Sequence, residues 1–236
     1  MLKENERIDD LGLRNLKIIQ NKEWFCFGID SVLLSDFAKN IKKGSKVIDL
    51  GTGTGIIATL LCGKTDLEKV VGIEIQQDIC EMANKSIKLN KLENRFEIIN
   101  ENIKNLKQVY KSGDFDVVVT NPPYKKVDTG VKNKEEKKII SRHEITANLE
   151  DFLQIATYLL KDKGEFYMVH RPDRLVDIIE LMRKNKIEPK VVRFVYPNIN
   201  KEPNLLLIKG VKNGKSFLKI EKNLYVYDES GEDTQE

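Results

Sequence analysis

The spacing of apolar residues changes repeatedly along the chain. From residue 46 onward, short runs rich in β-branched residues alternate with longer segments in which apolar residues recur every three or four positions. This alternation predicts parallel strands joined by crossover helices. We expect strands near residues 46–50, 69–74, 95–100, 115–120, 164–170, 189–196 and 204–209.

Three of the intervening segments carry an apolar stripe at helical spacing. The stripes are Ile79, Met82, Ala83 and Ile87; Leu149, Phe152, Leu153 and Ala156; and Leu175, Ile178, Ile179 and Met182. Residues three and four positions apart share one face of a helix. We therefore interpret the three stripes as surfaces that pack on the core, and not as ligand contacts.

The last two expected strands have no helical segment between them. Residues 197–203 (PNINKEP) predict a turn instead, so these strands should form an antiparallel hairpin at one edge of the sheet. The predicted fold class is α/β, with a seven-stranded, mostly parallel sheet that ends in this hairpin.

The chain is long enough for one large domain with a substantial core. We expect an N-terminal segment, residues 1–45, that packs on the core and contains a short helix within FGIDSVLLSDFAK. Residues 46–227 should form the main domain. The acidic and polar residues 228–236 predict a flexible tail.

The composition of the chain indicates where in the cell the protein is located, but it says little about the chemistry of the protein. The 40 basic and 37 acidic residues give a net charge of +3, which permits a nucleic-acid partner without indicating one. No apolar run approaches the ~20 residues that span a bilayer, and the charged start has no signal-peptide pattern. Cys26, Cys62 and Cys80 form no CxxC pair, so we expect neither disulfides nor a metal site. A cytoplasmic protein is predicted.

The stretch VIDLGTGTG, residues 47–55, ends the first expected strand in a glycine-rich loop. Gly51, Gly53 and Gly55 allow a tight turn and a close approach to a ligand, and the following helix offers free N–H groups. The spacing is GxGxG after Asp49, which differs from the GxGxxG that seats a pyrophosphate. An adenosine or a methionine tail is therefore the expected ligand.

Polar residues also follow the next two expected strands. Glu74 ends the second strand, where a carboxylate can accept hydrogen bonds from both hydroxyls of a ribose. Asn100, Glu101 and Asn102 follow the third strand, and one of them should meet the adenine ring. We choose Asn102 by its position.

The stretch VVVTNPPYKKV, residues 117–127, ends the fourth strand in an amide, two prolines and an aromatic ring. In a doubly wound sheet this strand lies beside the first, so the stretch should adjoin the glycine loop. The Asn121 side-chain oxygen and the Pro122 carbonyl are two acceptors, which suit a planar NH₂ group. Tyr124 offers a face for stacking on the ring or amide that carries this group.

The combination of DLGTGTG, Glu74 and NPPY resembles the S-adenosylmethionine-dependent N-methyltransferases that act on planar nitrogens, namely adenine N6, cytosine N4, guanine N2 and glutamine N5. The resemblance implies a Rossmann-like class I methyltransferase fold and S-adenosylmethionine as the cofactor. It also implies catalytic roles for Asn121, Pro122 and Tyr124. Methyl transfer would then be an in-line displacement that depends on positioning rather than on a strong base or a metal.

Two flanking stretches narrow the resemblance. FGIDSVLLSDFA (27–38) and SRHEITANLEDFL (141–153) resemble the family that methylates N6 of adenine 37, next to the anticodon of tRNA. This resemblance implies the anticodon loop of a tRNA as partner, and it makes Gly28 and Asp30 further candidates for the cofactor site. We expect a monomer. One departure from the family is Asn102, which stands where an Asp is expected.

Two other functions remain open at this stage. A protein-glutamine N5-methyltransferase also uses NPPY, although such enzymes usually carry a helical domain before the glycine loop, and only about 45 residues precede it here. A non-catalytic RNA-binding protein with this fold is the second alternative. The lysine-rich residues 125–142 are either a solvated loop or a contact for phosphates. His143 and His170 have no required role in the chemistry.

Overall fold

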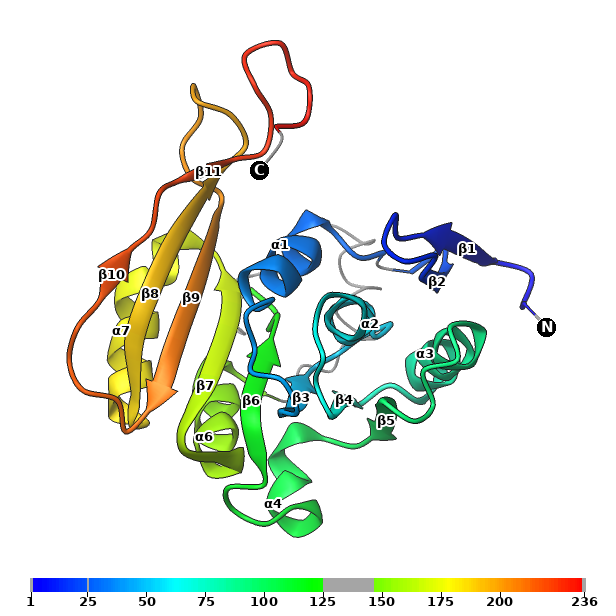
Figure 1. The fold of residues 1–236 in the computed structure, drawn as a ribbon, viewed down its shortest axis with the longest axis horizontal. Coiled ribbons are helices and arrows are strands. Elements are labelled where there is room, and N and C mark those ends of the chain that lie inside the picture. The colour runs from blue at the N-terminus through cyan, green and yellow to red at the C-terminus, as the bar shows by residue number, and fades with distance from the viewer. Residues whose placement is uncertain (1, 25, 125–146, 235–236) are drawn as a thin grey trace, which may run out of the picture.

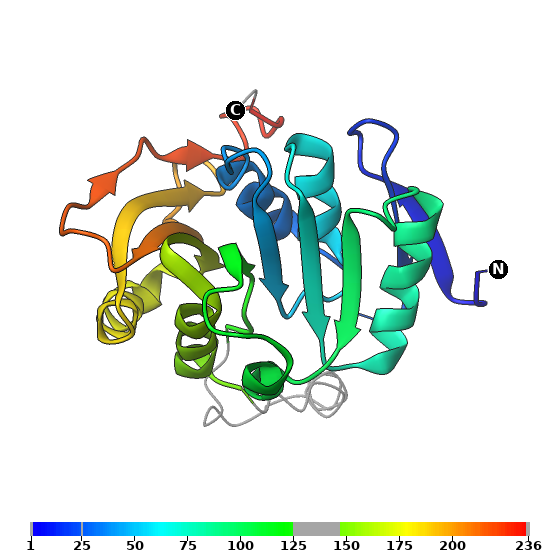
Figure 2. The same ribbon diagram turned by 60° about the horizontal axis from the view of Figure 1, so that its bottom comes forward.

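The computed structural model describes residues 2–24, 26–124 and 147–234, and its centre is a twisted sheet with helices on both faces (Figure 1). The parallel part of the sheet confirms the predicted strands. It consists of β3 (Lys46–Leu50), β4 (Lys69–Glu74), β5 (Phe96–Asn100), β6 (Phe115–Thr120) and β7 (Leu160–His170). The arrows of β3, β4 and β5 point in one direction in Figure 2.

The predicted antiparallel hairpin is also confirmed. Strands β8 (Ile187–Tyr196) and β9 (Leu205–Lys212) pair antiparallel, and β9 also pairs antiparallel with β7. The order across the sheet is β10 (Lys219–Ile220), β8, β9, β7, β6, β3, β4, β5. The sheet thus winds outward in both directions from the neighbouring strands β3 and β6, as a doubly wound fold requires.

The prediction of seven strands is wrong, because the main sheet has nine within the described ranges. The two additional strands, β10 (Lys219–Ile220) and β11 (Leu224–Tyr225), each contain two residues and pair parallel with β8. Strands this short have no recognisable sequence pattern. They form because the returning chain pairs with the otherwise open edge of β8.

The helices cover both faces of the sheet and bury the predicted stripes. On one face lie α1 (Ile29–Phe37), α2 (Ile56–Lys64) and α3 (Gln77–Leu89). On the other lie α4 (Leu106–Val109), α6 (Leu149–Leu159) and α7 (Leu175–Lys184), together with the short 3₁₀ turns η1 (Ile103–Asn105) and η2 (Pro172–Arg174). The most buried members of the stripes are Met82, Ala83, Leu153, Ala156, Ile178 and Met182.

The N-terminal segment contains a second small sheet that the sequence did not predict. Strands β1 (Glu6–Asp10) and β2 (Lys17–Asn21) pair antiparallel and lie against α3. The Ser86 hydroxyl accepts a hydrogen bond from the Ile19 N–H at 2.9 Å, and the Asn90 side chain bonds the N–H and the carbonyl of Lys17. Gln20, 1% exposed, accepts from the Phe27 N–H at 2.9 Å. The segment before α1 is therefore anchored to the hairpin.

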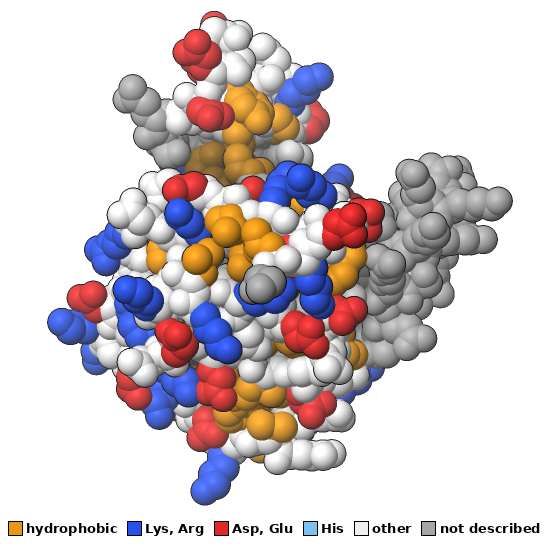
Figure 3. All heavy atoms as spheres, turned by 90° about the vertical axis from the view of Figure 1, so that its right-hand side faces the viewer, with side chains coloured by type: hydrophobic (Ala, Val, Ile, Leu, Met, Phe, Trp, Pro, Cys, Tyr) orange, Lys and Arg blue, Asp and Glu red, His pale blue; other side chains and the backbone are white. Residues whose placement is uncertain are grey.

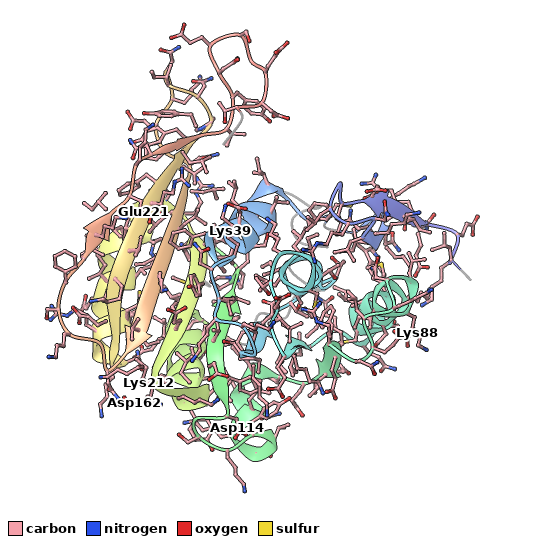
Figure 4. All side chains as sticks on the ribbon, viewed as in Figure 1. Lys39, Lys88, Asp114, Asp162, Lys212 and Glu221 are labelled. Atoms are coloured by element: carbon pink, nitrogen blue, oxygen red, sulfur yellow. The ribbon has the colours of Figure 1, made fainter. Side chains whose placement is uncertain are left out.

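One face of the molecule carries charges of both signs in close mixture (Figure 3). Figure 3 shows acidic and basic side chains interspersed over the face that carries the N-terminal hairpin and α3. The labelled Asp114, Asp162 and Lys212 lie at the edge of the sheet where β6 and β7 begin (Figure 4). Asp162 accepts a hydrogen bond from the Asn213 amide there, at 2.9 Å. No helix in the described ranges is long and apolar enough to cross a membrane.

Candidate active site

The predicted site residues converge at the edge of the sheet where β3, β4, β5 and β6 end. Leu50 of β3 pairs with Ile73 of β4 and with Thr120 of β6, and Glu74 pairs with Asn100 of β5. The glycine loop, Glu74, the third strand tip and the NPPY stretch therefore all lie at one edge. In doubly wound sheets this edge, at the switch in strand order, is where ligands bind.

The glycine loop has the backbone conformation that its sequence requires. Gly51, Gly53 and Gly55 have φ values of 73°, 56° and 82°, a region that other residues rarely adopt. The N–H groups of Gly51 and Thr52 donate to the Ile73 carbonyl at 3.0 and 2.9 Å. A Cβ atom at Gly53 would meet nothing within 4 Å among the described residues. The loop is thus fixed to β4 on one side and open at Gly53.

Glu74 lies beside this loop and is largely buried. Its Oε2 accepts a hydrogen bond from the Gly53 N–H at 3.1 Å, and its Oε1 accepts from the Gln76 N–H at 2.9 Å. Each carboxylate oxygen has a further lone pair. The side chain is therefore held in place and still able to accept hydrogen bonds from two hydroxyls of a ligand.

Asp49 is fully buried beneath the loop. Its Oδ2 accepts a hydrogen bond from the Thr52 hydroxyl at 2.6 Å, whereas its Oδ1 has no partner within the described ranges. Burial raises the pKa of Asp49 from 3.8 to about 7, the negative charge of Glu74 adds to the rise, and the Thr52 hydrogen bond opposes it. An unpaired buried carboxylate oxygen is costly, so a proton or a cationic ligand group nearby would stabilise this arrangement.

The side chains after β5 are mostly engaged in local structure. Asn100 donates to the carbonyls of Glu74 and Ile75 at 3.0 and 2.9 Å, which ties the tips of β4 and β5 together. The Asn102 Oδ1 accepts from the Lys104 N–H at 3.0 Å and caps η1. Glu101 accepts from the side chain of Asn105 and from the backbone of Asn102, which lowers its pKa. A contact between Asn102 and adenine stays a prediction.

Ile75 is a further residue of this edge, and nothing in the sequence indicated its exposure. It directly follows Glu74 and is 45% exposed, although it is a large apolar side chain. An apolar side chain next to a carboxylate that can accept hydrogen bonds from a ligand offers a surface on which an aromatic ring can pack. The signal in the sequence was weak, because an isoleucine at the end of a strand resembles any other core residue.

The side chains of Asn121 and Tyr124 form a hydrogen-bonded cluster with Asp30 of α1. The Asn121 Nδ2 donates to the Asp30 Oδ2 at 2.9 Å and lies 3.3 Å from the Ser31 hydroxyl. The Tyr124 hydroxyl lies 2.7 Å from the Asn121 Oδ1 and 3.0 Å from the Asp30 Oδ2. We call Asp30, Asn121 and Tyr124 the amide clamp. The sequence placed Asp30 near the cofactor but gave no sign of these contacts.

The ring of Tyr124 packs against His170, the last residue of β7. The two ring centroids are 5.1 Å apart and the rings are tilted by 56°. Burial lowers the pKa of His170 to about 4, so its imidazole is neutral near pH 7, and its Nδ1 accepts from the Arg171 N–H. Burial and the neighbouring Asp30 raise the pKa of Tyr124. His170 therefore supports the ring of Tyr124 as an uncharged neighbour.

Gly28 has a steric role beside the clamp. A Cβ atom at Gly28 would lie 2.9 Å from the Asp30 Oδ1, so any other residue here would displace the carboxylate.

No group of three or more metal-ligating side chains occurs in the described ranges. The predicted loop at 125–142 and His143 lie outside the described residues.

The chain is similar in sequence to known methyltransferases. Residues 41–222 match a family described as a methyltransferase domain. A tRNA1(Val) (adenine(37)-N6)-methyltransferase of Porphyromonas gingivalis is 30% identical over 185 residues, which cover 76% of this chain and 72% of that protein. The same enzyme of Parabacteroides distasonis is 28% identical over 214 residues, 84% of each chain.

Solved structures share the fold at lower identity. A predicted O-methyltransferase of Agrobacterium tumefaciens matches with a TM-score of 0.66 and 17% identity, over 85% of this chain and 88% of that one. TYW2 of P. horikoshii in complex with MeSAdo matches with a TM-score of 0.62 and 14% identity, over 91% of this chain and 74% of that one. The fold is thus the Rossmann-like methyltransferase fold.

Proposed function

Because the chain belongs to the family of the tRNA1(Val) (adenine(37)-N6)-methyltransferases, we propose that it transfers a methyl group from S-adenosylmethionine to N6 of adenine 37 in a tRNA. The observation that carries the proposal is the position of Asn121 and Pro122. Asn121 and Pro122 directly follow β6 at the edge of the sheet beside the glycine loop, and the Asn121 side-chain oxygen and the Pro122 carbonyl would serve as two hydrogen-bond acceptors. They suit the two hydrogens of an exocyclic amine.

The residues around the glycine loop fit S-adenosylmethionine. Glu74 would accept hydrogen bonds from the ribose hydroxyls, and Ile75 would contact the adenine ring. The open side of Gly53 leaves room for the cofactor backbone, and the unpaired oxygen of Asp49 favours a positively charged group above it. The bound cofactor would supply an electrophilic methyl group on a sulfonium.

Asn121 and Pro122 would position the amine for transfer. The Asn121 Oδ1 and the Pro122 carbonyl would accept the two N–H groups, which turns the nitrogen lone pair away from them and toward the methyl group. The catalytic contribution is then orientation in a partly desolvated site. No strong base is needed before transfer, which agrees with the low pKa of His170.

An adenine in a tRNA must leave its stack to enter this edge of the sheet, and a base in the anticodon loop is already exposed. Arg171 follows β7 directly and is exposed, and its guanidinium group has no hydrogen-bond or ion-pair partner in the described part of the chain. Its charge is close enough to oppose the rise in the Tyr124 pKa. We propose Arg171 as a contact for a phosphate beside the target base. We also propose that the protein acts as a monomer in the cytoplasm.

Methyl transfer from radiolabelled S-adenosylmethionine tests the function. The protein is incubated with unmodified total tRNA or, separately, with a protein fraction that contains release factors, and the products are digested and identified. We expect label in N6-methyladenosine from tRNA. Label in methylglutamine would assign the activity to protein substrates, and the absence of label in both would favour a non-catalytic RNA-binding protein.

A further inference from the structure

The Asp30 carboxylate faces Asn121, a side chain whose chemistry depends on its orientation. An asparagine amide has an acceptor end and a donor end of nearly equal size. Asp30 lies 2.9 Å from Nδ2 of Asn121. We propose that Asp30 is a positioning residue that fixes the Asn121 amide with its oxygen toward the target amine. This inference rests on the proposed function and deepens it.

The orientation of the amide decides whether the amine can bind. With Oδ1 toward the substrate, Asn121 accepts from the N–H of the amine. With the amide reversed, two NH₂ groups would face each other, and the hydrogen bond would be replaced by repulsion. An ionised carboxylate can only accept hydrogen bonds, so Asp30 selects the NH₂ end of Asn121 for itself. The Ser31 hydroxyl, 3.3 Å away, lies on the same side.

Asp30 is itself held firmly for this task. Its Oδ1 accepts from the Ser31 N–H at 2.9 Å, and it occupies the first turn of α1, where the helix dipole favours a negative charge. The space next to Oδ1 exists because Gly28 has no Cβ. Gln20 in turn anchors the backbone at Phe27. The N-terminal hairpin is therefore linked to Asp30 through the backbone that begins at Phe27.

Tyr124 completes the clamp from the other side. Its hydroxyl has one proton and two acceptors within reach, the Asn121 Oδ1 at 2.7 Å and the Asp30 Oδ2 at 3.0 Å. When the proton is given to Asn121, one lone pair of the Asn121 oxygen remains for the amine. When it is given to Asp30, no proton lies between the Tyr124 and Asn121 oxygens, which repel each other at 2.7 Å. In either case the amide keeps its orientation.

Exchanging the carboxylate of Asp30 and the amide of Asn121 between the two positions tests the proposal. We expect Asp30→Asn to lower kcat about tenfold to hundredfold, the effect of losing one charge-assisted hydrogen bond, with the Kd of S-adenosylmethionine within about twofold of wild type. Asn121→Asp alone should also be slow, because two carboxylates then face each other. The double variant should be faster than either single variant, because a carboxylate at 121 presents an acceptor in both orientations.

Asp36→Asn is the matched control, because it makes the same change in the same helix, at a residue bound to Lys39 and Lys64 and not to the clamp. It should retain the wild-type kcat. A double variant slower than both single variants would contradict the proposal. So would wild-type kcat in Asp30→Asn, or a loss in that variant that appears entirely as weaker cofactor binding.

A second measurement separates this inference from the proposed function. If wild-type protein transfers no methyl group to tRNA, the function is wrong, but the clamp can still be examined by NMR with ¹⁵N-labelled asparagine. The Asn121 side-chain signal, identified by its loss in Asn121→Asp, should exchange with solvent about tenfold faster in Asp30→Asn than in wild type. It should be unchanged in Asp36→Asn. Equal exchange in wild type and Asp30→Asn would refute the clamp.

Discussion

The Glu74 carboxylate accepts a hydrogen bond from the Gly53 N–H at 3.1 Å, which joins the tip of β4 to the middle of the glycine loop. Glu74, which we propose to bind the ribose, therefore also holds the glycine loop in shape. We propose that the cofactor lies beside this same loop. A change in either residue should alter cofactor affinity before it alters the chemistry.

Replacement of Glu74 by Ala should weaken the binding of S-adenosylmethionine by about tenfold or more, since it removes hydrogen bonds made by a charged acceptor. Isothermal titration calorimetry gives the Kd. Glu68→Ala is the control, because Glu68 precedes β4 at its other end and forms an exposed ion pair with Lys46. Equal affinity in Glu74→Ala and Glu68→Ala would show that Glu74 does not contact the cofactor.

Two glycines of the loop should respond differently to alanine. Both have positive φ values, so each substitution introduces backbone strain of about 1 kcal/mol. At Gly55 the new Cβ would also lie 2.9 Å from the Phe96 ring, whereas at Gly53 it meets nothing within 4 Å in the described structure. We expect Gly55→Ala to lower the free energy of unfolding more, and Gly53→Ala to lower cofactor affinity more.

Denaturant unfolding and calorimetry on the two glycine variants measure these quantities side by side. Gly44→Ala serves as a control for positive φ alone, because Gly44 also has open space around it and lies outside the site. If Gly53→Ala binds the cofactor as tightly as Gly44→Ala, the open side of the loop is not the cofactor path.

The buried carboxyl of Asp49 should make stability depend on pH. Its pKa is about 7 in the folded chain, and its ordinary value is 3.8. Between these values the folded protein holds a proton that the unfolded chain has lost, so stability falls as pH rises, by at most about 1.4 kcal/mol per pH unit. Below about pH 4 and above about pH 7 this contribution no longer changes.

Urea unfolding of cofactor-free protein from pH 4 to pH 8 measures this contribution. Asp49→Asn has no carboxyl to titrate, so its stability should fall less over that range than the stability of the wild type. Parallel pH profiles in the two proteins would mean that Asp49 is already ionised in the folded state at pH 4.

Arg171 should affect tRNA affinity and leave cofactor affinity unchanged. We expect Arg171→Ala to raise the KM for tRNA and to reduce the slope of log Kd against log salt by about one phosphate contact. Filter binding at several salt concentrations gives the slope. Arg183→Ala is the control, since Arg183 lies on α7 and pairs with Glu188. The same slope in wild type and Arg171→Ala would exclude the phosphate contact.

The parts of the molecule that are visible in the sequence are those fixed by local rules. The glycine loop needs positive φ values, and parallel strands need apolar runs, so both could be recognised directly. Strand β7 was predicted from residue 164 but begins at Leu160, because the polar residues 161–163 conceal its start. The two-residue strands β10 and β11 depend on the partner strand β8 and not on their own residues.

The contacts of the amide clamp could not be predicted from the sequence either. Asn121 was identified from the NPPY stretch, but its contact with Asp30 joins residues 91 positions apart. No periodicity encodes such a pair. The sequence predicts that Tyr124 offers a face for stacking, but it does not show that the ring packs against His170. Asn102 was chosen by position alone, and its side-chain oxygen caps η1.

The measurement that tests the central claim most directly is mapping of the methylated nucleotide. Wild-type protein and Asn121→Ala are incubated with S-adenosylmethionine and an unmodified tRNA1(Val) transcript, and fragments of the anticodon loop are analysed by mass spectrometry. We predict one added methyl group, on N6 of adenine 37, with wild type and none with Asn121→Ala, although both proteins bind the cofactor. Methylation elsewhere, or equal methylation by the two proteins, would contradict the account.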